Sequence, residues 1–318
     1  MKTISILIPT YNEEDNVLPL YDALREQLAI LEDRYGYEIV FIDNKSQDST
    51  REKLQQLCMQ DKRVKAIFNT CNFGHSNSPY YGLLQTSGDC TILMSADFQE
   101  PPELLSRMVE AWEQGHKIIC MVKTASRENP FMYFLRTAYY RVIRKMARVE
   151  FIEHFTGFGL YDKSFIDILR KLDDPEPFFR GIVAELGFDM IAIPYTQAKR
   201  RAGKSSNTFS TLYDYAMLSV TAYTKIGLRL ATVFGLAISV ASTIAALVFL
   251  ILHVIGGDGR TGIALLAIGM FFLGGVQIFF TGLLSEYVMN LQRRAMKRPL
   301  VIEERRLNFE ADAVNSHQ

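Results

Sequence analysis

Two long apolar segments near the end of the chain constrain its fold more than any other feature. Residues 230–257 contain no Asp, Glu, Lys or Arg, and a second apolar run extends from Gly262 to Ser285 after the short polar break GDGRT. A helix needs about 20 apolar residues to cross a hydrocarbon core of about 30 Å. Both runs qualify, so the sequence predicts two transmembrane helices within residues 230–287, joined as a hairpin, rather than buried helices of a soluble core.

Basic residues at the ends of these segments predict their orientation. Lys225 and Arg229 precede the first segment, and the connecting loop has only Arg260. The residues that follow the second segment include Arg293, Arg294, Lys297 and Arg298. Because loops rich in Lys and Arg stay on the cytosolic side, we expect both termini in the cytosol. The second segment contains Gly269, Gly274, Gly275 and Gly282, which suit close helix packing and favour a tight hairpin or a homo-oligomer.

Composition narrows the class of partner. The 318 residues include 35 Lys and Arg and 35 Asp and Glu, so the formal net charge is zero and nucleic acid is not an expected partner. None of the four cysteines forms a CxxC pair: they are Cys58, Cys71, Cys90 and Cys120. This pattern is typical of reduced cytosolic thiols rather than of a disulfide framework or a zinc site.

The part of the chain before the apolar segments alternates predicted strands and helices. Short apolar runs predict strands at residues 4–8, 38–42, 64–68, 91–94 and 117–122. Helical stretches follow the first four strands, at about 16–31, from 49, at 79–85 and after 102. This alternation predicts an α/β fold with a mostly parallel sheet and helices on both faces.

Polar residues cluster directly after four of these strands. The clusters are TYNEE at 10–14, DNKS at 43–46, NFGH at 72–75 and SADFQE at 95–100. Ligands bind such sheets beyond the carboxyl ends of the strands, so these clusters predict a binding site. No GxGxxG follows the first strand, which disfavours a dinucleotide-binding dehydrogenase.

Taken in order, the strings PTYNEE, IDNKSQDST, NFGH and SADFQEPPE resemble the family 2 glycosyltransferases of the dolichol-phosphate mannose synthase and bactoprenol glucosyltransferase type. The resemblance continues through FFRG at 178–181 and RRAGKSS at 200–206, and ends in the two apolar segments. It implies the GT-A fold and an inverting transfer of a sugar from a nucleotide-sugar, with a UDP-sugar favoured, to a polyprenyl phosphate. The cytosolic face of a bacterial inner membrane is then the expected location.

The resemblance also implies roles for individual residues. The implied donor-binding residues are Pro9, Tyr11, Glu13, Asp43, Ser95, Ala96 and Asp97. Asp97 and Gln99 match positions that hold a divalent metal, Mg²⁺ or Mn²⁺, on the donor diphosphate. The implied acceptor phosphate ligands are Arg127, Arg136, Arg180, Arg201 and Lys204. The implied catalytic residues are Asp97, Arg127, Arg136 and Arg201.

Three positions depart from the usual strings of the family. Ser95 stands where the first Asp of DAD is usual, Asn44 replaces the second Asp of DDGS, and TGFG at 156–159 replaces a stretch that often carries Asp and Arg. Fewer carboxylates predict a weaker metal site, which Glu100, Glu153 or Ser95 could complete in part. These departures leave open a second hypothesis, a nucleotide-sugar-binding membrane scaffold that has lost turnover.

The remaining segments predict how the chain meets the bilayer. Residues 130–149 combine apolar and aromatic side chains with five positive charges and no acid, which predicts a helix in the headgroup layer, or else a cytosolic core-facing helix with a basic outer face. Residues 1–206 are the expected cytosolic catalytic domain, 207–229 an amphipathic helix, and 288–318 a cytosolic tail, flexible beyond Pro299. A processive polysaccharide synthase is disfavoured because the only tryptophan, Trp112, lies outside any QxxRW string.

Overall fold

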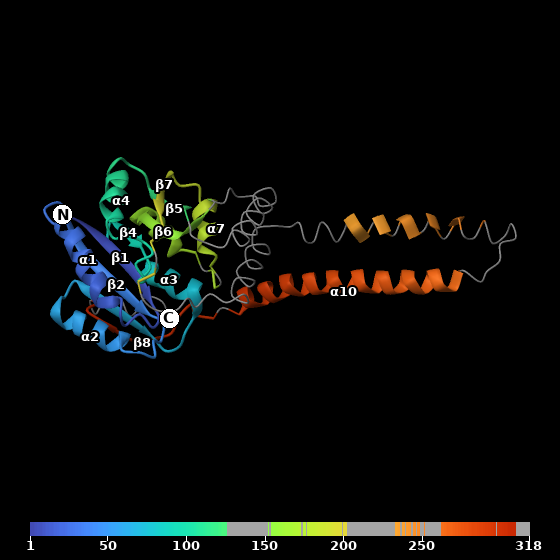
Figure 1. The fold of residues 1–318 in the computed structure, drawn as a ribbon, viewed down its shortest axis with the longest axis horizontal. Helices are drawn as coiled ribbons and strands as arrows, with labels where there is room; N and C mark the ends of the chain where they lie inside the picture. Colours follow the sequence, from blue (N-terminus) through green and yellow to red (C-terminus); the bar gives the residue numbers. More distant parts are fainter. Residues whose placement is uncertain are drawn as a thin grey trace. The chain divides into compact units, whose positions relative to one another are not determined.

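The structure of the protein, a computed structural model, describes residues 1–125, 152, 154–172, 174–175, 177–198, 200–201, 262–296 and 298–309, with scattered positions between 233 and 251. The chain divides into two compact units. One unit contains the sheet and the helices that cover it, and the other contains the long helix α10 (Figure 1).

The first unit is built on a sheet whose eight described strands have the order β7-β5-β6-β4-β1-β2-β3-β8. The strands are β1 (Lys2–Thr10), β2 (Tyr35–Asp43), β3 (Val64–Asn69), β4 (Cys90–Leu93), β5 (Ile118–Ala125), β6 (Phe155–Asp162), β7 (Met190–Thr196) and β8 (Glu303–Leu307). Strands β4, β1, β2 and β3 run parallel, as do β5 and β7, whereas β6 is antiparallel to its neighbours β4 and β5 and β8 is antiparallel to β3. The structure thus confirms the predicted α/β fold with a mostly parallel sheet.

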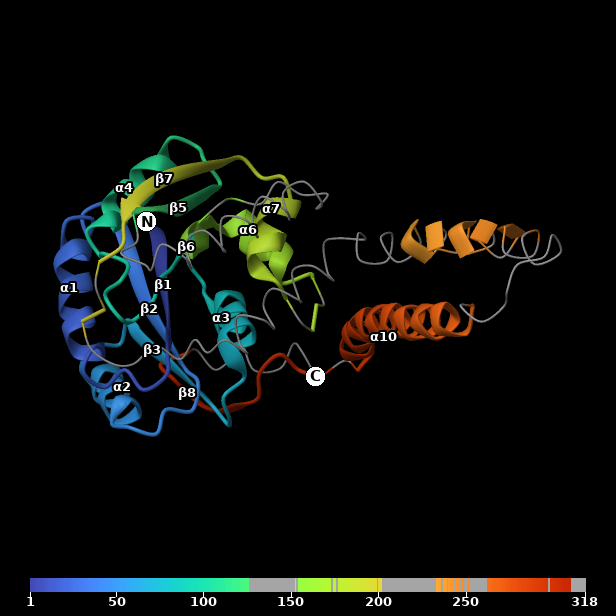
Figure 2. The same cartoon turned by 45° about the vertical axis from the view of Figure 1, so that its right-hand side comes forward.

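Helices cover both faces of this sheet, as Figure 2 shows. One face packs against α1 (Val17–Ala29), α2 (Thr50–Gln60) and α4 (Leu104–Glu113), and the other against α3 (Gly74–Gln85), α6 (Lys163–Leu169) and α7 (Phe179–Glu185). Successive side chains of a strand point to opposite faces. In β1, Ile6 therefore joins the core beneath α1, while Leu7 joins the core beneath α3. Both side chains are fully buried, and such burial contributes about 1.5–3 kcal/mol per side chain.

The five predicted strands and four predicted helices are all present. The largest difference concerns α3, which begins at Gly74 and contains Pro79, whereas the sequence predicted a start at Pro79. Proline favours the first turn of a helix, which explains why the sequence pointed to the later start.

The prediction of a flexible tail beyond Pro299 is wrong. Residues Glu303–Leu307 form β8, which pairs antiparallel with β3 at the edge of the sheet. The Nδ2 atom of Asn308 then donates to the backbone carbonyls of Cys58 and Val64, each at 2.7 Å. The strand sequence EERRL is highly charged, as edge strands often are, so it gave no alternating apolar signal.

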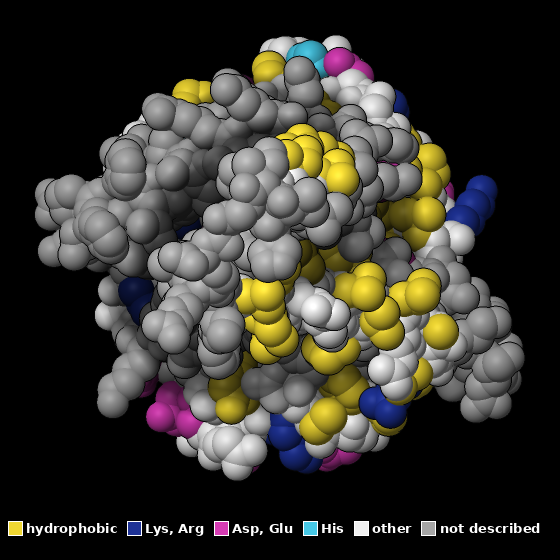
Figure 3. Space-filling model, turned by 90° about the vertical axis from the view of Figure 1, so that its right-hand side faces the viewer, with side chains coloured by type: hydrophobic (Ala, Val, Ile, Leu, Met, Phe, Trp, Pro, Cys, Tyr) yellow, Lys and Arg dark blue, Asp and Glu magenta, His cyan; other side chains and the backbone are white. Residues whose placement is uncertain are grey.

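The second unit contains α10 (Gly262–Ala295), a helix of 34 residues. Its segment Phe272–Met289 is long and apolar enough to cross a membrane, and none of that segment is buried. Ile278 and Phe279 are 75% and 67% exposed. Figure 3 shows exposed hydrophobic side chains in yellow. Exposed apolar surface of this extent is typical of contact with a membrane or a partner.

Several membrane predictions concern residues that the structure leaves out. The segment predicted as the first span lies largely outside the described residues, although Val233–Ser242 forms a shorter apolar helix over the positions that are described. The helices predicted at 130–149 and 207–229 lie wholly outside them. The two-helix hairpin and its orientation therefore stay predictions, and one helix long enough to span is described.

Candidate active site

The carboxyl ends of β1, β2 and β4 bring the predicted site residues to one edge of the sheet. Thr10, the last residue of β1, lies opposite Asp43, the last residue of β2. Beyond β4, the Met94 N–H donates to the Leu7 carbonyl of β1 at 3.1 Å. The predicted donor residues Pro9, Tyr11, Glu13, Asp43, Ser95, Ala96 and Asp97 all lie at or just beyond these strand ends.

Asp97 is only 4% exposed and is the centre of a polar cluster with Ser95, Gln99 and Arg200, called here the first cluster of the site. Its Oδ1 atom accepts hydrogen bonds from the Ser95 hydroxyl at 2.9 Å and from the Gln99 backbone N–H at 3.1 Å. Its Oδ2 atom lies 2.9 Å from an Nη atom of Arg200 and 3.1 Å from the Nε atom. Both carboxylate oxygens therefore have partners, and the guanidinium is the compensating charge. Phe98 adopts a φ of 61°, which bulky residues rarely do, so this turn is strained.

The sequence pointed to Arg201, whereas the structure brings Arg200 to Asp97. The Arg201 backbone N–H donates to the Asp97 carbonyl at 3.3 Å, and its guanidinium lies 5.2 Å from the centre of the Phe98 ring. The two neighbouring arginines thus contact different groups of the turn at 97–98: Arg200 contacts the Asp97 carboxylate, and Arg201 contacts the Asp97 carbonyl and the Phe98 ring. The only sequence signal for Arg200 was the Arg-Arg pair, which offered no means of choosing between its members.

Glu13 lies between the first cluster of the site and the second. Its Oε1 atom is 4.0 Å from an Nη atom of Arg200, and its Oε2 atom accepts from Asn16 Nδ2 at 2.6 Å. Burial raises the pKa of Glu13, against the opposing effects of the Asn16 hydrogen bond and the Arg200 charge. Its backbone N–H donates to Thr50 Oγ1 at 2.9 Å, which fixes the loop after β1 against α2.

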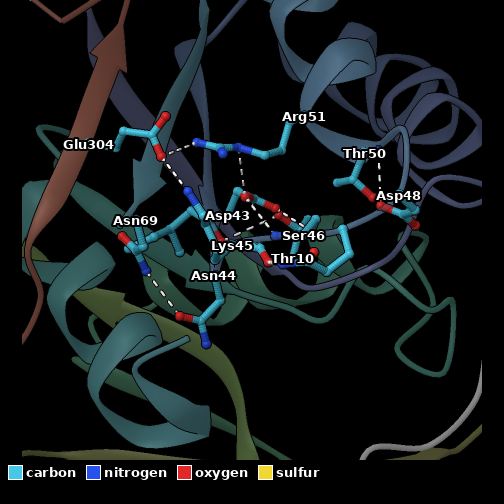
Figure 4. A network of polar contacts seen from close by, with 12 residues as sticks. Thr10, Asp43, Asn44, Lys45, Ser46, Asp48, Thr50, Arg51, Asn69 and Glu304 are labelled. Atoms are coloured by element: carbon cyan, nitrogen blue, oxygen red, sulfur yellow. Dashed lines mark hydrogen bonds and ion pairs between the residues drawn. The ribbon is translucent and has the colours of Figure 1, made fainter. Parts of the chain in front are cut away.

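Asp43 is fully buried and is the centre of a polar cluster with Asn12, Ser46 and Arg51, called here the second cluster of the site (Figure 4). The Ser46 backbone N–H donates to its Oδ2 atom at 3.1 Å, the Ser46 hydroxyl donates to Oδ1, and Arg51 Nε lies 3.4 Å from Oδ2. Burial raises the pKa of Asp43, while the Ser46 hydrogen bonds and the Arg51 charge oppose that shift. Ser46 Oγ also accepts from the Asn12 N–H at 2.9 Å, which joins the loops after β1 and β2.

Asn44, one of the departures from the family strings, has a structural explanation. Its Nδ2 atom donates to Asn72 Oδ1 at 2.8 Å and to the Gly74 carbonyl at 3.1 Å. Its Oδ1 atom accepts from Asn69 Nδ2 at 3.2 Å and from the Phe73 N–H at 2.9 Å. An ionised aspartate has no donor and could make only the second pair of bonds. Asn44 therefore fixes the loop after β3.

The TGFG departure, residues 156–159, lies within β6, and the backbone of the sheet accounts for its glycines. A Cβ atom on Gly159 would lie 2.2 Å from the Ile119 carbonyl oxygen of β5, so no larger residue fits there without a shift of the backbone. Gly157 has a φ of 106°, a conformation that side-chain-bearing residues rarely adopt. The backbone thus explains both glycines of this stretch.

The described residues provide only some of the ligands that the predicted metal site would need. Within the described part of the chain, no group of three or more His, Cys, Asp or Glu side chains could hold a metal ion. Asp97 supplies one carboxylate, and the Ser95 hydroxyl that donates to it supplies a neutral oxygen, which are ligand types that Mg²⁺ and Mn²⁺ accept; the contact of Gln99 with Asp97 is made by its backbone N–H. The set fits a metal only where a bound diphosphate adds further oxygens and Arg200 leaves the Oδ2 atom.

Glu100 is a buried carboxyl group beside this set. Its Oε2 atom accepts from the Ser95 backbone N–H at 2.6 Å. Burial raises the pKa of Glu100 to about 7, and the nearby Asp97 charge adds to the rise while the Ser95 bond opposes it. Near neutral pH the group therefore exists in both protonation states.

Replacing Glu100 by Gln should change how stability depends on pH. Between the ordinary pKa of 4.5 and about 7, the folded wild type keeps a proton that the unfolded chain releases. Wild-type stability from this group therefore falls as pH rises through that window and levels off above it. Gln does not titrate. The fall in Tm between pH 5 and pH 7.5 should therefore be larger in the wild type than in the variant, by about 3 °C or more. An equal drop in both proteins would contradict the assignment.

The remaining predicted phosphate ligands are mostly not described. Arg180 lies in α7, with its guanidinium 6.0 Å from the centre of the Phe178 ring. Arg127, Arg136 and Lys204 lie outside the described residues, so their roles stay predictions.

Comparison with known proteins finds relatives that are named as glycosyltransferases. An uncharacterized glycosyltransferase of Bacillus subtilis, YkcC, is 28% identical over 307 residues, which are 96% of this chain and 94% of that protein. The bactoprenol glucosyl transferase of Shigella phage SfX is 28% identical over 298 residues, 93% of this chain and 97% of that protein. Among solved structures, mannosyl-3-phosphoglycerate synthase from Rubrobacter xylanophilus matches with a TM-score of 0.47 at 15% identity, over 72% of this chain and 74% of that one.

A family model assigns the chain more directly. The model described as glycosyl transferase family 2 matches residues 5–169, which is more than half of the 318 residues. The match runs from β1 to the end of α6, and so includes Glu13, Asp43 and Asp97 at the strand ends. The chain therefore belongs to glycosyl transferase family 2 and is a glycosyltransferase.

Proposed function

We propose that this glycosyltransferase moves a sugar, with inversion, from a nucleotide-sugar to a polyprenyl phosphate at the cytosolic face of a membrane, and that a UDP-sugar is the favoured donor. The proposal rests mainly on the similarity to a bactoprenol glucosyl transferase over 93% of the chain, apolar C-terminal region included. The exposed apolar length of α10 supports a membrane location, where an isoprenoid acceptor resides. We propose the plasma membrane of a bacterium, called the inner membrane where there are two, because the named relatives come from a bacterium and a bacteriophage.

For this reaction the protein must mainly provide compensating positive charge and position the two substrates. A polyprenyl phosphate is largely ionised at neutral pH, since the second pKa of a phosphate monoester is about 6, so it needs little general-base help. The difficulty is that an anionic donor and an anionic acceptor must meet at one carbon. Arg200, held between Asp97 and Glu13, is a described cation at the strand ends that could offset this repulsion and stabilise the departing diphosphate.

A divalent metal would add to this charge. Asp97 would hold the ion together with Gln99 and Ser95, and the metal would stabilise negative charge on the leaving nucleoside diphosphate. In the described geometry Arg200 pairs with the same carboxylate. We therefore propose that Arg200 leaves Asp97 when the donor binds, so that its guanidinium could bind a phosphate group, a task that its planar fork suits, and the Asp97 carboxylate would be free to help hold a metal ion.

The direct test is transfer of radiolabel into lipid by detergent-solubilised protein. UDP-glucose, UDP-N-acetylglucosamine and GDP-mannose would each be offered with a polyprenyl phosphate and with Mg²⁺ or Mn²⁺. We expect one donor to give a single-sugar lipid and to release its nucleoside diphosphate. Binding of a donor without such release for any acceptor would favour the scaffold hypothesis, and labelled polymer would favour a processive synthase.

A further inference from the structure

The C-terminal strand brings an acidic side chain to the second cluster. Glu304 of β8 accepts from Lys45 Nζ at 2.8 Å and from an Nη atom of Arg51 at 3.0 Å (Figure 4). Lys45 belongs to the loop after β2 and Arg51 to the first turn of α2. A residue about 260 positions along the chain therefore completes the surroundings of Asp43.

Arg51 is shared between two carboxylates. Its Nε atom lies 3.4 Å from Asp43 Oδ2, within ion-pair range, yet this buried nitrogen makes no hydrogen bond within the described residues. Its Nη atom makes a hydrogen bond to Glu304. The hydrogen bonds from Lys45 and Arg51 lower the pKa of Glu304 to about 2, so it remains a charged acceptor. Glu304 thus holds the guanidinium in a position from which it does not hydrogen-bond Asp43.

This arrangement matters because Asp43 is fully buried. A ligand can reach its carboxylate only where a neighbouring group gives way, and Arg51 is the charged neighbour. Removing a charged group from its partner is unfavourable when no other acceptor is present. Glu304 offers Arg51 such an acceptor, so Asp43 can exchange the guanidinium for N–H or O–H donors of a ligand.

We propose that Glu304 is a positioning residue for the nucleoside part of the donor, and that it acts by holding Arg51 away from Asp43. The inference rests on the proposed function, because it takes Asp43 as a nucleoside ligand. Without Glu304, Arg51 would pair fully with Asp43 and occupy the acceptor atoms that the nucleoside needs. The strand that follows the membrane helix along the chain would then be part of the donor site.

Glu303 provides a matched control on the same strand. Its Oε1 atom accepts from the Tyr81 hydroxyl at 2.8 Å, and its carboxylate pairs with Arg306, but it contacts neither Lys45 nor Arg51. Replacing Glu303 by Gln therefore weakens contacts of β8 without touching the second cluster. A general loosening of the strand would affect both variants alike.

The experiment measures binding of UDP and of uncharged uridine, with GDP and guanosine as a parallel pair, together with steady-state kinetics. Glu304→Gln should raise the Kd of both the nucleotide and its nucleoside about tenfold, the effect of one hydrogen bond to a charged group, with kcat at saturating donor changed less than about twofold. Glu303→Gln should stay within about twofold of wild type, and Glu304→Asp should recover part of the loss. Using the nucleoside separates loss at Asp43 from any change in attraction for phosphates.

A double variant tests whether Glu304 acts through Arg51. In an Arg51→Gln background, adding Glu304→Gln should change Kd less than about twofold, because the group that it positions is absent. Unchanged or tighter binding in Glu304→Gln, an equal loss in Glu303→Gln, or a full tenfold loss in the Arg51→Gln background would each overturn the inference. If the wild type binds neither UDP nor GDP, the proposed function fails and the inference fails with it.

Discussion

Replacing Asp97 by Asn is expected to lower kcat/KM for sugar transfer by about 10²–10³-fold, the usual cost of removing one group that stabilises charge in a transition state. Asn keeps the shape of the side chain, and its oxygen can still accept from Ser95 or Gln99. It removes the negative charge that pairs with Arg200 and that would hold a metal on the donor diphosphate. The measurement is release of nucleoside diphosphate with the donor that the wild type uses.

A control variant separates chemistry from folding. Asp189→Asn removes another carboxylate, one that contacts His116 at 2.8 Å outside the site, and should transfer sugar at the wild-type rate. Asp97→Asn should keep the far-ultraviolet circular dichroism spectrum of the wild type. Wild-type turnover by a folded Asp97→Asn protein would remove Asp97 from the site and take the proposed metal position with it.

Replacing Arg200 by Ala should lower kcat/KM by about 10²-fold, because the guanidinium lies on Asp97 and near Glu13, where donor and acceptor charges would meet. Lys at this position should restore only part of the rate, since an ammonium is a point charge that cannot bind phosphate through two parallel hydrogen bonds. Initial rates of lipid labelling at varied acceptor concentration would measure the loss.

Two further variants test this assignment. Arg107, an exposed residue of α4, serves as the matched control, and Arg107→Ala should transfer at the wild-type rate. Arg201→Ala compares the residue that the sequence favoured with the one that the geometry favours. If Arg201→Ala loses activity and Arg200→Ala does not, the contacts of Arg200 with Asp97 have no part in transfer.

The sequence predicted five strands from short apolar runs and missed three strands whose signal is weaker. The first five strands are apolar runs, and all five are present. Strand β6 contains Gly157 and Gly159, β7 contains Pro194 and has only one buried residue, Tyr195, and β8 is EERRL. Glycine, proline and charge all weaken a strand signal, although tertiary pairing with existing strands stabilises each of these segments.

For the candidate site, the sequence predicted where the acidic residues lie along the chain, but not which residues they contact. Asp43 and Asp97 could be predicted because each follows an apolar strand, and the carboxyl ends of parallel strands meet at one edge. The contacts of Asp97 with Arg200 and of Arg51 with Glu304 join residues that are far apart in sequence. No local pattern specifies such pairs, so they follow only from the folded sheet.

The antiparallel pairing of β8 with β3 has a practical consequence for anyone who shortens this protein. A fragment cut before α10 would lose more than that exposed apolar helix, because the last strand of the sheet lies downstream of it in the chain. The exposed edge of β3 would then present unpaired N–H and C=O groups, which can pair with a strand of a second molecule. Self-association of such a fragment would reflect this missing strand rather than the assembly of the intact protein.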